Sequence, residues 1–349
     1  MLSIGPIRLD MPVAQAALSG YSDLAMRRVA RLHGASYTLN EVVLDKLVLV
    51  RGKKQRFITR LPPDDHPVGG QLMGAEPAVL AQAAAVLVEA GYDCVDINFG
   101  CPVRKVLGRC RGGFLLSQPQ TALEIIRCVI DAVAGRRPVT LKMRRGMDAS
   151  AQSEHDFFTI LDGAFNLGVA AVTVHARTVQ QRYEGPSDWS FLTRVKRHAG
   201  DRVVLGSGDL FAAEDCIRMI HQTGVDGVTV ARGCIGYPWI FEEIGALLAG
   251  KPRPEPPSVT RQGETIRQHY AWAVDLYGPK VACKVMRKFG IKYSELHPAH
   301  LAVRDAFIQV KTNQDWEAAM GQWYDPGRDW PPGQRRLGTG HLIAAGAEL

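Results

Sequence analysis

Short apolar runs alternate with helical patterns through residues 12–231. We predict eight buried strands in this region, at 12–16, 37–41, 68–72, 94–98, 139–143, 171–175, 203–206 and 227–231. Between them, stretches such as 78–90 and 121–133 place apolar residues three and four positions apart, which predicts helices. Eight strand–helix units within about 250 residues have the size and period of a (β/α)8 TIM barrel, an α/β fold. A doubly wound sheet is disfavoured, because no GxGxxG turn follows residues 12–16.

The pattern changes after residue 250. The stretch KPRPEPPS at 251–258 is proline-rich and predicts a linker. Helical periodicity returns at 261–277, 281–293, 298–311 and 314–323, which predicts a small helical bundle. From residue 325 the chain is rich in Pro, Gly and Arg, and we expect a loosely ordered tail. The predicted organisation is a catalytic barrel at 1–250, a linker at 251–258, a helical domain at 259–324 and a tail at 325–349.

Charge adds a candidate partner. The net charge is +7, and residues 251–300 hold nine Lys or Arg against four Asp or Glu. A basic face of this kind indicates a polyanion such as RNA, although a solvated helix face explains the charge equally well. There is no apolar run of eighteen residues, no secretion pattern and no CxxC pair among the seven cysteines. We therefore expect a reduced cytoplasmic protein that does not bind membranes or metals, and a monomer by default.

Polar residues recur at the carboxyl ends of the predicted strands. Gln71, Asn98, Lys142, His175 and Asp209 all lie at or just after such an end. A single histidine in this setting is usually a satisfied core residue. Five polar residues together predict one site, because the carboxyl ends of barrel strands converge on one mouth.

A cysteine follows the fourth strand. Cys101 stands between Gly100 and Pro102, at the start of a basic, glycine-containing loop in the stretch 93–116. Barrel enzymes place reactive groups at such positions. A buried, unreactive thiol is the plainer alternative, since most free cysteines are small core residues.

Two loops suggest an anionic cofactor. Ser207-Gly208-Asp209 follows the seventh strand and Ala231-Arg232-Gly233 follows the eighth, where TIM barrels often bind phosphate. A flavin site would use Lys142 near the N1–C2 edge of the ring, with His175 and Gln71 as hydrogen-bonding partners. The alternative for Lys142 is a buried ion pair with Glu41 or Asp96.

These residues resemble the tRNA-dihydrouridine synthases, most closely the bacterial B-type branch, over roughly residues 3–323. The most specific match is the run from Asp96 to Pro102, DINFGCP, followed by Lys105-Val106. Other matches are the segments Gly70-Gln71-Leu72, 140–144 (TLKMR), 174–178 (VHART), Gly208-Asp209, Arg232-Gly233 and 277–279 (YGP).

The resemblance implies a reaction and the residues that serve it. FMN reduced by NADPH passes a hydride from N5 to C6 of uridine in tRNA, and Cys101 protonates C5. The target nucleotide is extruded from the folded RNA, Asn98 meets the uracil edge, and Arg144, Tyr183 and Lys105 hold the nucleotide. The implied phosphate contacts of the helical domain are Lys284, Arg287, Lys288 and Lys292.

The sequence also departs from the family pattern. The first-strand signature Ala-Pro-Met-Ala-Gly reads Ala16-Ala17-Leu18-Ser19-Gly20 here, so Ala17 and Leu18 take the place of the pair under the flavin. The phosphate loops have Ser207 for Asn and Ala231 for Gly. Leu can replace Met against an aromatic ring at little cost.

Three alternatives to this reaction stay open. A related enzyme could use the same site on another RNA or for a different reaction at uracil C5, with Cys110 as a second thiol. A small-molecule enzyme of the dihydroorotate or dihydropyrimidine dehydrogenase type would share the barrel but would not need the helical domain. A descendant that has lost its flavin would only bind RNA.

Overall fold

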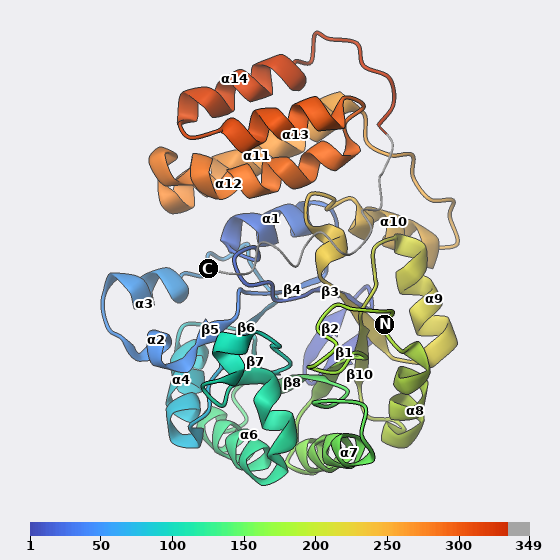
Figure 1. Ribbon diagram of the computed structural model, residues 1–349. Coiled ribbons are helices and arrows are strands. Elements are labelled where there is room, and N and C mark those ends of the chain that lie inside the picture. Colours follow the sequence, from blue (N-terminus) through green and yellow to red (C-terminus); the bar gives the residue numbers. More distant parts are fainter. Residues whose placement is uncertain (334–349) are drawn as a thin grey trace.

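The computed structural model describes residues 1–333. Its core is a closed barrel of parallel strands, in which each strand pairs with its neighbours and β4 pairs with β6 to complete the ring (Figure 1). The barrel strands are β3 (Val13–Gln15), β4 (Tyr37–Leu39), β6 (Val68–Met73), β7 (Cys94–Phe99), β8 (Val139–Arg144), β9 (Ala171–His175), β10 (Val204–Ser207) and β11 (Gly227–Val230). The eight predicted strands and the TIM-barrel fold are confirmed.

Helices surround the ring and are connected to it in chain order. They are α1 (Leu24–Leu32), α4 (Pro77–Glu89), α6 (Pro119–Val133), α7 (Ala151–Asn166), α8 (Trp189–Ala199), α9 (Ala213–Thr223) and α10 (Ile240–Leu248). Local sequence starts several of them: Asp23 and Ser150 accept hydrogen bonds from the first-turn N–H groups of α1 and α7. Proline begins α4 and α6, where a missing N–H costs nothing.

The barrel is filled in layers. A hairpin of β1 (Leu2–Ile4) and β2 (Ile7–Leu9) packs Leu2, Ile4 and Leu9 into an apolar cluster with Tyr37 and Leu205. Beyond this layer, alternate residues of the strands turn polar, because side chains of a strand alternate between its two faces. Asn98 pairs with Lys142 across β7–β8, and His175 pairs with Ser207 across β9–β10. The polar layer therefore forms at the carboxyl end.

The connection from β4 to β6 differs from the others. Instead of one long helix it contains the short strand β5 (Val43–Leu44) and two short helices, α2 (Asp45–Leu49) and α3 (Lys53–Ile58). Sequence periodicity did not predict these elements. The connection from β7 to α6 is also elaborate, with α5 (Arg104–Leu107) and the 3₁₀ helix η1 (Gly112–Ser117).

The C-terminal helices pack directly on the barrel (Figure 1). They are α11 (Val259–Tyr277), α12 (Pro279–Tyr293), the 3₁₀ helix η3 (Ser294–Leu296), α13 (His300–Gln309) and α14 (Asn313–Trp323), close to the predicted ranges. One continuous hydrophobic core includes Met26 and Trp239 of the barrel and Ile266 and Phe289 of the helices. The two predicted domains therefore share a core.

The expected loose tail is only partly within the structure. Residues 325–333 are ordered against the helices: the Trp330 ring centroid lies 4.6 Å from that of His297, and Arg328 stacks on Trp330. This stretch is less loosely ordered than expected, because Trp330 packs in a partly buried position against His297. Residues 334–349 lie outside the described residues. No helix within residues 1–333 is long and apolar enough to cross a membrane.

Candidate active site

A cavity of about 250 Å³ opens at the carboxyl ends of the barrel strands. Most of the residues predicted for the site line it: Ala17, Leu18, Gln71, Asn98, Cys101, Lys142, Arg144, His175, Tyr183, Ser207, Gly208, Asp209, Ala231 and Arg232. These residues come from seven different strands or the loops that follow them, so the barrel gathers what the sequence disperses.

A directional set of hydrogen bonds forms the polar wall of the cavity. Asp96 accepts from Thr140 Oγ1 at 2.6 Å and from Gln71 Nε2 at 2.7 Å. Because a carboxylate only accepts, the Gln71 amide must present its oxygen to Asn98 Nδ2, which lies 2.7 Å away. Asn98 Oδ1 in turn accepts from the backbone N–H of Gly100 at 2.9 Å and of Cys101 at 3.1 Å. Asp96 thus positions the cysteine loop through two amides.

This arrangement limits what Asn98 can offer a ligand. Its oxygen already accepts two hydrogen bonds, so only the second N–H of Nδ2 remains. Asn98 is therefore a donor, suited to a carbonyl oxygen of a ligand. Burial raises the pKa of Asp96, while the Thr140 and Gln71 hydrogen bonds and the Lys142 charge oppose that shift.

Lys142 faces the cavity without an ion pair. Among residues 1–333, no carboxylate lies within 4.0 Å of its Nζ. Burial, reinforced by Arg144, lowers the pKa of Lys142 to about 8. The alternative of a pair with Glu41 or Asp96 is wrong. Glu41 is instead hydrogen-bonded to the Gly20 backbone N–H, and both Asp96 oxygens are occupied by Gln71 and Thr140.

Cys101 is partly exposed to the same cavity. Burial raises the pKa of its thiol, and a backbone hydrogen bond from Val103 and the charges of Arg144 and Lys142 only partly offset this. The group is therefore a protonated thiol at neutral pH, able to donate a proton. Cys110 is exposed on the surface of the same loop, with a positive φ of 55°.

Cations dominate the rest of the cavity mouth. Arg144 donates to the Gly100 carbonyl at 2.9 Å, and its guanidinium lies 5.5 Å from the centre of the Tyr183 ring. Arg232 lies 4.9 Å from the same ring. Burial and these cations lower the pKa of His175 well below its usual value, so the imidazole is neutral. The field at the mouth favours an anionic ligand.

The two phosphate-type loops touch each other. A Cβ on Gly233 would lie 2.2 Å from the Leu210 carbonyl oxygen, so only glycine allows this approach. Gly233 itself is not among the described residues that line the cavity. The Asp209 carboxylate accepts from Arg177 Nη2 at 2.7 Å and from the Ser187 N–H at 2.7 Å, so it braces the loop.

Some predicted contacts lie elsewhere. Lys105 is exposed on α5, outside the cavity lining. On α12, Lys284 and Arg287 are exposed. Lys288 is not a freely exposed cation: its Nζ donates to the Gly20 carbonyl and lies 4.8 Å from the Tyr21 ring centre. Lys292 pairs with Glu295 at 2.7 Å.

Sequence reasoning missed three residues of the site. Arg177 holds Asp209, and it was noted only as part of the motif VHART. Thr229 lines the cavity with a buried hydroxyl that has no hydrogen-bond partner among the described residues. Phe211 lies under Arg232, with 4.9 Å between the guanidinium and the ring centre. Arg177 lies two residues after His175, the last residue of a predicted strand. This position just past a strand end is the signal that could have revealed it.

Comparison with known proteins decides the family. The family model described as dihydrouridine synthase (Dus) matches residues 14–323, nearly the whole described chain. The chain belongs to the dihydrouridine synthase family. Curated relatives include a "Probable tRNA-dihydrouridine synthase" of Mycobacterium tuberculosis, 35% identical over 328 residues, covering 91% of this chain and 84% of the relative. Another, with the same name, is from Rhodobacter capsulatus, 35% identical over 305 residues, covering 86% and 91%.

Solved structures share the barrel fold of this chain. Morphinone reductase in complex with tetrahydroNAD aligns with a TM-score of 0.54 and 13% identity, covering 73% of this chain and 91% of that one. The old yellow enzyme homologue from Zymomonas mobilis aligns with a TM-score of 0.52 and 12% identity, covering 73% and 93%. Residues 1–333 contain no group of three or more His, Cys, Asp or Glu arranged to hold a metal ion.

Proposed function

We propose that this protein reduces the C5=C6 bond of uridine in tRNA to 5,6-dihydrouridine, with FMN as its bound flavin and NADPH as the reductant. The observation that carries the proposal is the pairing of a protonated thiol, Cys101, with an unpaired cation, Lys142, across one cavity. The family membership and the names of the relatives support the same reaction.

The residues that line the cavity suit a flavin with a phosphate. Lys142 lacks a carboxylate partner among the described residues and would stabilise negative charge on the N1–C2 side of the ring. The unpartnered Thr229 hydroxyl and the second N–H of Gln71 Nε2 are further groups that a ligand can satisfy. Ser207, Gly208, Ala231 and Arg232 would hold the phosphate, and Ala17 and Leu18 would lie against the ring. When bound, reduced FMN supplies the hydride for C6.

Cys101 completes the reaction by giving the proton from its Sγ to C5. One hydride and one proton replace the C5=C6 π bond with two C–H bonds, so the uracil gains two electrons and no net charge. The raised pKa keeps the thiol protonated for this step. Arg144 and Lys142 then stabilise the thiolate until water restores its proton, because both lie close enough to oppose the rise in the thiol pKa.

The remaining mouth residues orient the flipped nucleotide. Asn98 donates its free N–H to a uracil carbonyl, and Tyr183, whose ring lies near Arg144 and Arg232, stands at the cavity entrance. Tyr183 is 39% exposed, so it can meet a nucleotide that enters from solvent. The same cavity would accept a uridine from another RNA. The contacts that select the RNA therefore lie on the surface outside the cavity.

The test compares Cys101→Ala with Cys110→Ala, a matched change at an exposed thiol in the same loop. We expect both variants to keep the flavin absorbance bands and to lose them when NADPH is added. Cys101→Ala should lower dihydrouridine formation in unmodified tRNA by about a hundredfold or more, the usual effect of removing a general acid. Nucleoside mass spectrometry of the digested RNA measures the product.

Three results would overturn parts of this proposal. Full activity in Cys101→Ala would remove the cysteine as the acid. A protein that stays without flavin bands after reconstitution with FMN would favour an RNA-binding descendant. Reduction of free pyrimidines to dihydropyrimidines, with tRNA left unchanged, would favour a small-molecule enzyme.

A further inference from the structure

The connection between β4 and β6 carries positive charge that forms no ion pair within residues 1–333. Residues 51–60, which we call the basic arm, contain five exposed cations: Arg51, Lys53, Lys54, Arg56 and Arg60. Residues 46–63 contain no Asp or Glu. Within the described part of the chain, none of the five side chains forms a hydrogen bond or an ion pair. An ordinary solvated surface intersperses both signs of charge.

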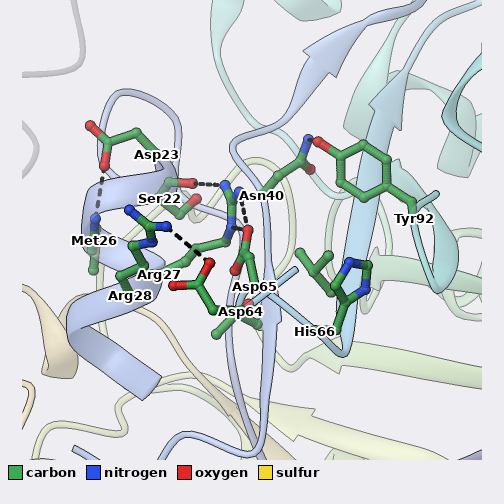
Figure 2. A network of polar contacts seen from close by, with 12 residues as sticks. Ser22, Asp23, Met26, Arg27, Arg28, Asn40, Asp64, Asp65, His66 and Tyr92 are labelled. Atoms are coloured by element: carbon green, nitrogen blue, oxygen red, sulfur yellow. Dashed lines mark hydrogen bonds and ion pairs between the residues drawn. The ribbon is translucent and has the colours of Figure 1, made fainter. Parts of the chain in front are cut away.

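The acids that follow the arm are already engaged by α1, as Figure 2 shows. Asp65 accepts from Arg27 Nε at 2.9 Å and from Arg31 Nε at 3.3 Å, and Asp64 accepts from Arg28 Nη2 at 2.9 Å. These contacts fix the end of the arm to the barrel. Because both carboxylates are bonded to arginines of α1, neither Asp64 nor Asp65 neutralises the arm.

A chain of hydrogen bonds ties the arm to the cavity wall. Tyr92 Oη donates to the Ile58 carbonyl at the end of α3 at 3.0 Å, and accepts from Asn40 Nδ2 at 3.1 Å. Figure 2 shows the contact between Asn40 and Tyr92. Asn40 Oδ1 accepts from the backbone N–H of Gln71 at 2.7 Å, and Gln71 lines the cavity. These hydrogen bonds therefore hold the end of α3 in a fixed position relative to the cavity wall.

The basic face continues from the arm to the cavity along α12. The Phe57 ring of α3 lies 5.6 Å from the ring of Tyr277, two residues before α12 begins. Helix α12 then exposes Lys280, Lys284 and Arg287. Farther along, Lys288 lies over Tyr21, a residue of the cavity lining. Cations thus line a path from the arm to the mouth.

We propose that the basic arm is a second RNA-binding surface, which holds the phosphate backbone of the tRNA at a set distance from the nucleotide in the cavity. This inference rests on the proposed function, since that function supplies the RNA. Unpaired Lys and Arg side chains attract phosphates without reading base sequence, which suits a surface that positions a folded RNA. RNA is favoured over other polyanions because the path of cations ends at a cavity that receives a nucleotide.

The experiment uses the full-length, flavin-loaded protein. Lys53→Gln/Lys54→Gln/Arg56→Gln removes three charges from the arm. Arg8→Gln/Arg197→Gln/Lys251→Gln removes three equally exposed cations, which lie away from the arm on β2, α8 and the linker. Binding of unmodified tRNA is measured by fluorescence anisotropy between low and physiological salt. We expect the arm variant to bind about tenfold more weakly, with a salt slope shallower by about 2, and the control to lose much less.

The outcomes separate this inference from the function beneath it. If the unaltered protein neither binds tRNA nor forms dihydrouridine, the proposed function fails and the arm proposal fails with it. If the unaltered protein does both and the arm variant equals the control, only the arm proposal is overturned. Loss of binding to anionic lipid vesicles, with tRNA binding unchanged, would also overturn it. Unchanged flavin bands and NADPH bleaching in the arm variant show that the fold is intact.

Discussion

Lys142 brings a charge into the barrel that the protein alone does not balance. The pKa of Lys142 is about 8 in the folded protein, below its usual value of 10.5 in the unfolded chain. Folding without a ligand therefore disfavours the charged form of Lys142. Between pH 8 and 10.5 the unfolded chain binds more protons than the folded one. The free energy of unfolding of the cofactor-free protein must therefore rise with pH in this window, by at most about 3 kcal/mol.

We predict that Lys142→Met has opposite effects on stability and on cofactor affinity. At pH 7 it should raise the free energy of unfolding of the cofactor-free protein, because a buried charge is removed, and abolish the gain between pH 8 and 10.5. It should weaken FMN binding about tenfold or more, because the anionic ligand loses its cation. Denaturant unfolding and fluorescence titration with FMN measure the two effects.

Lys105→Met is the matched control, since Lys105 is exposed on α5 outside the cavity lining. It should change neither the pH dependence nor the FMN affinity. Unaltered FMN affinity in Lys142→Met would remove Lys142 from the cofactor site.

The sequence could predict which residues face the cavity where those residues lie near the carboxyl end of a strand. Gln71, Asn98, Lys142 and His175 all occupy the cavity as expected, because strand periodicity sets which residues point inward. Lys288 could not be placed in this way. Its contact with the Gly20 carbonyl joins residues 268 positions apart, and only the packed structure brings them together.

At the scale of elements, the loops after β10 and β11 form one support for an anion. Gly233 of the second loop lies against the Leu210 carbonyl of the first, so each loop fixes the other. An added methyl group would force the two backbones apart. The loops carry the four proposed phosphate contacts Ser207, Gly208, Ala231 and Arg232, which all line the cavity.

We predict that Gly233→Ala destabilises the protein by about 1–3 kcal/mol, as overpacking usually does, and weakens FMN binding. Gly321→Ala provides the control, because its Cβ would meet no atom within 4 Å and it lies at an exposed position of α14. That change should stabilise by about 0.5–1 kcal/mol. Thermal unfolding with and without FMN compares the two. Equal FMN affinity in both variants would separate these loops from the cofactor.

Elements with regular periodicity were predictable, and short irregular ones were not. The eight barrel strands and the four C-terminal helices follow patterns that repeat over many residues. The strands β1 and β2 have three residues each, too few to show a period. In α3 the helix is six residues long and none is buried, so it has no apolar stripe to detect. The basic arm was missed for this reason.

At the scale of the whole molecule, contacts that the sequence separates join barrel and helices. His33 of the barrel pairs with Glu242 at 2.6 Å and lies 3.3 Å from Thr265 of α11. Tyr277 donates to Asp23, the N-cap of α1, at 2.9 Å. Together with the shared core, these contacts mean that the C-terminal helices stabilise the barrel. The proline-rich stretch predicted a linker between two domains, and nothing in the sequence indicated the hydrophobic core that the barrel and the helices share.

We predict that the protein unfolds in one cooperative transition. Four of its six tryptophans, Trp272, Trp316, Trp323 and Trp330, lie in the C-terminal region, so tryptophan fluorescence reports mainly on the helices. Flavin absorbance reports on the barrel. Denaturant midpoints from the two probes should coincide. A helical transition that precedes flavin release would show that the units are independent.

The shared core also changes what the peptide chain between the two halves contributes. Residues 251–256 are mostly exposed, and the helices are held to the barrel by packed side chains rather than by this segment of backbone. A protease nick in the linker would therefore leave two fragments associated as one particle. The covalent connection sets the local concentration of the helices during folding, and the finished enzyme no longer depends on it.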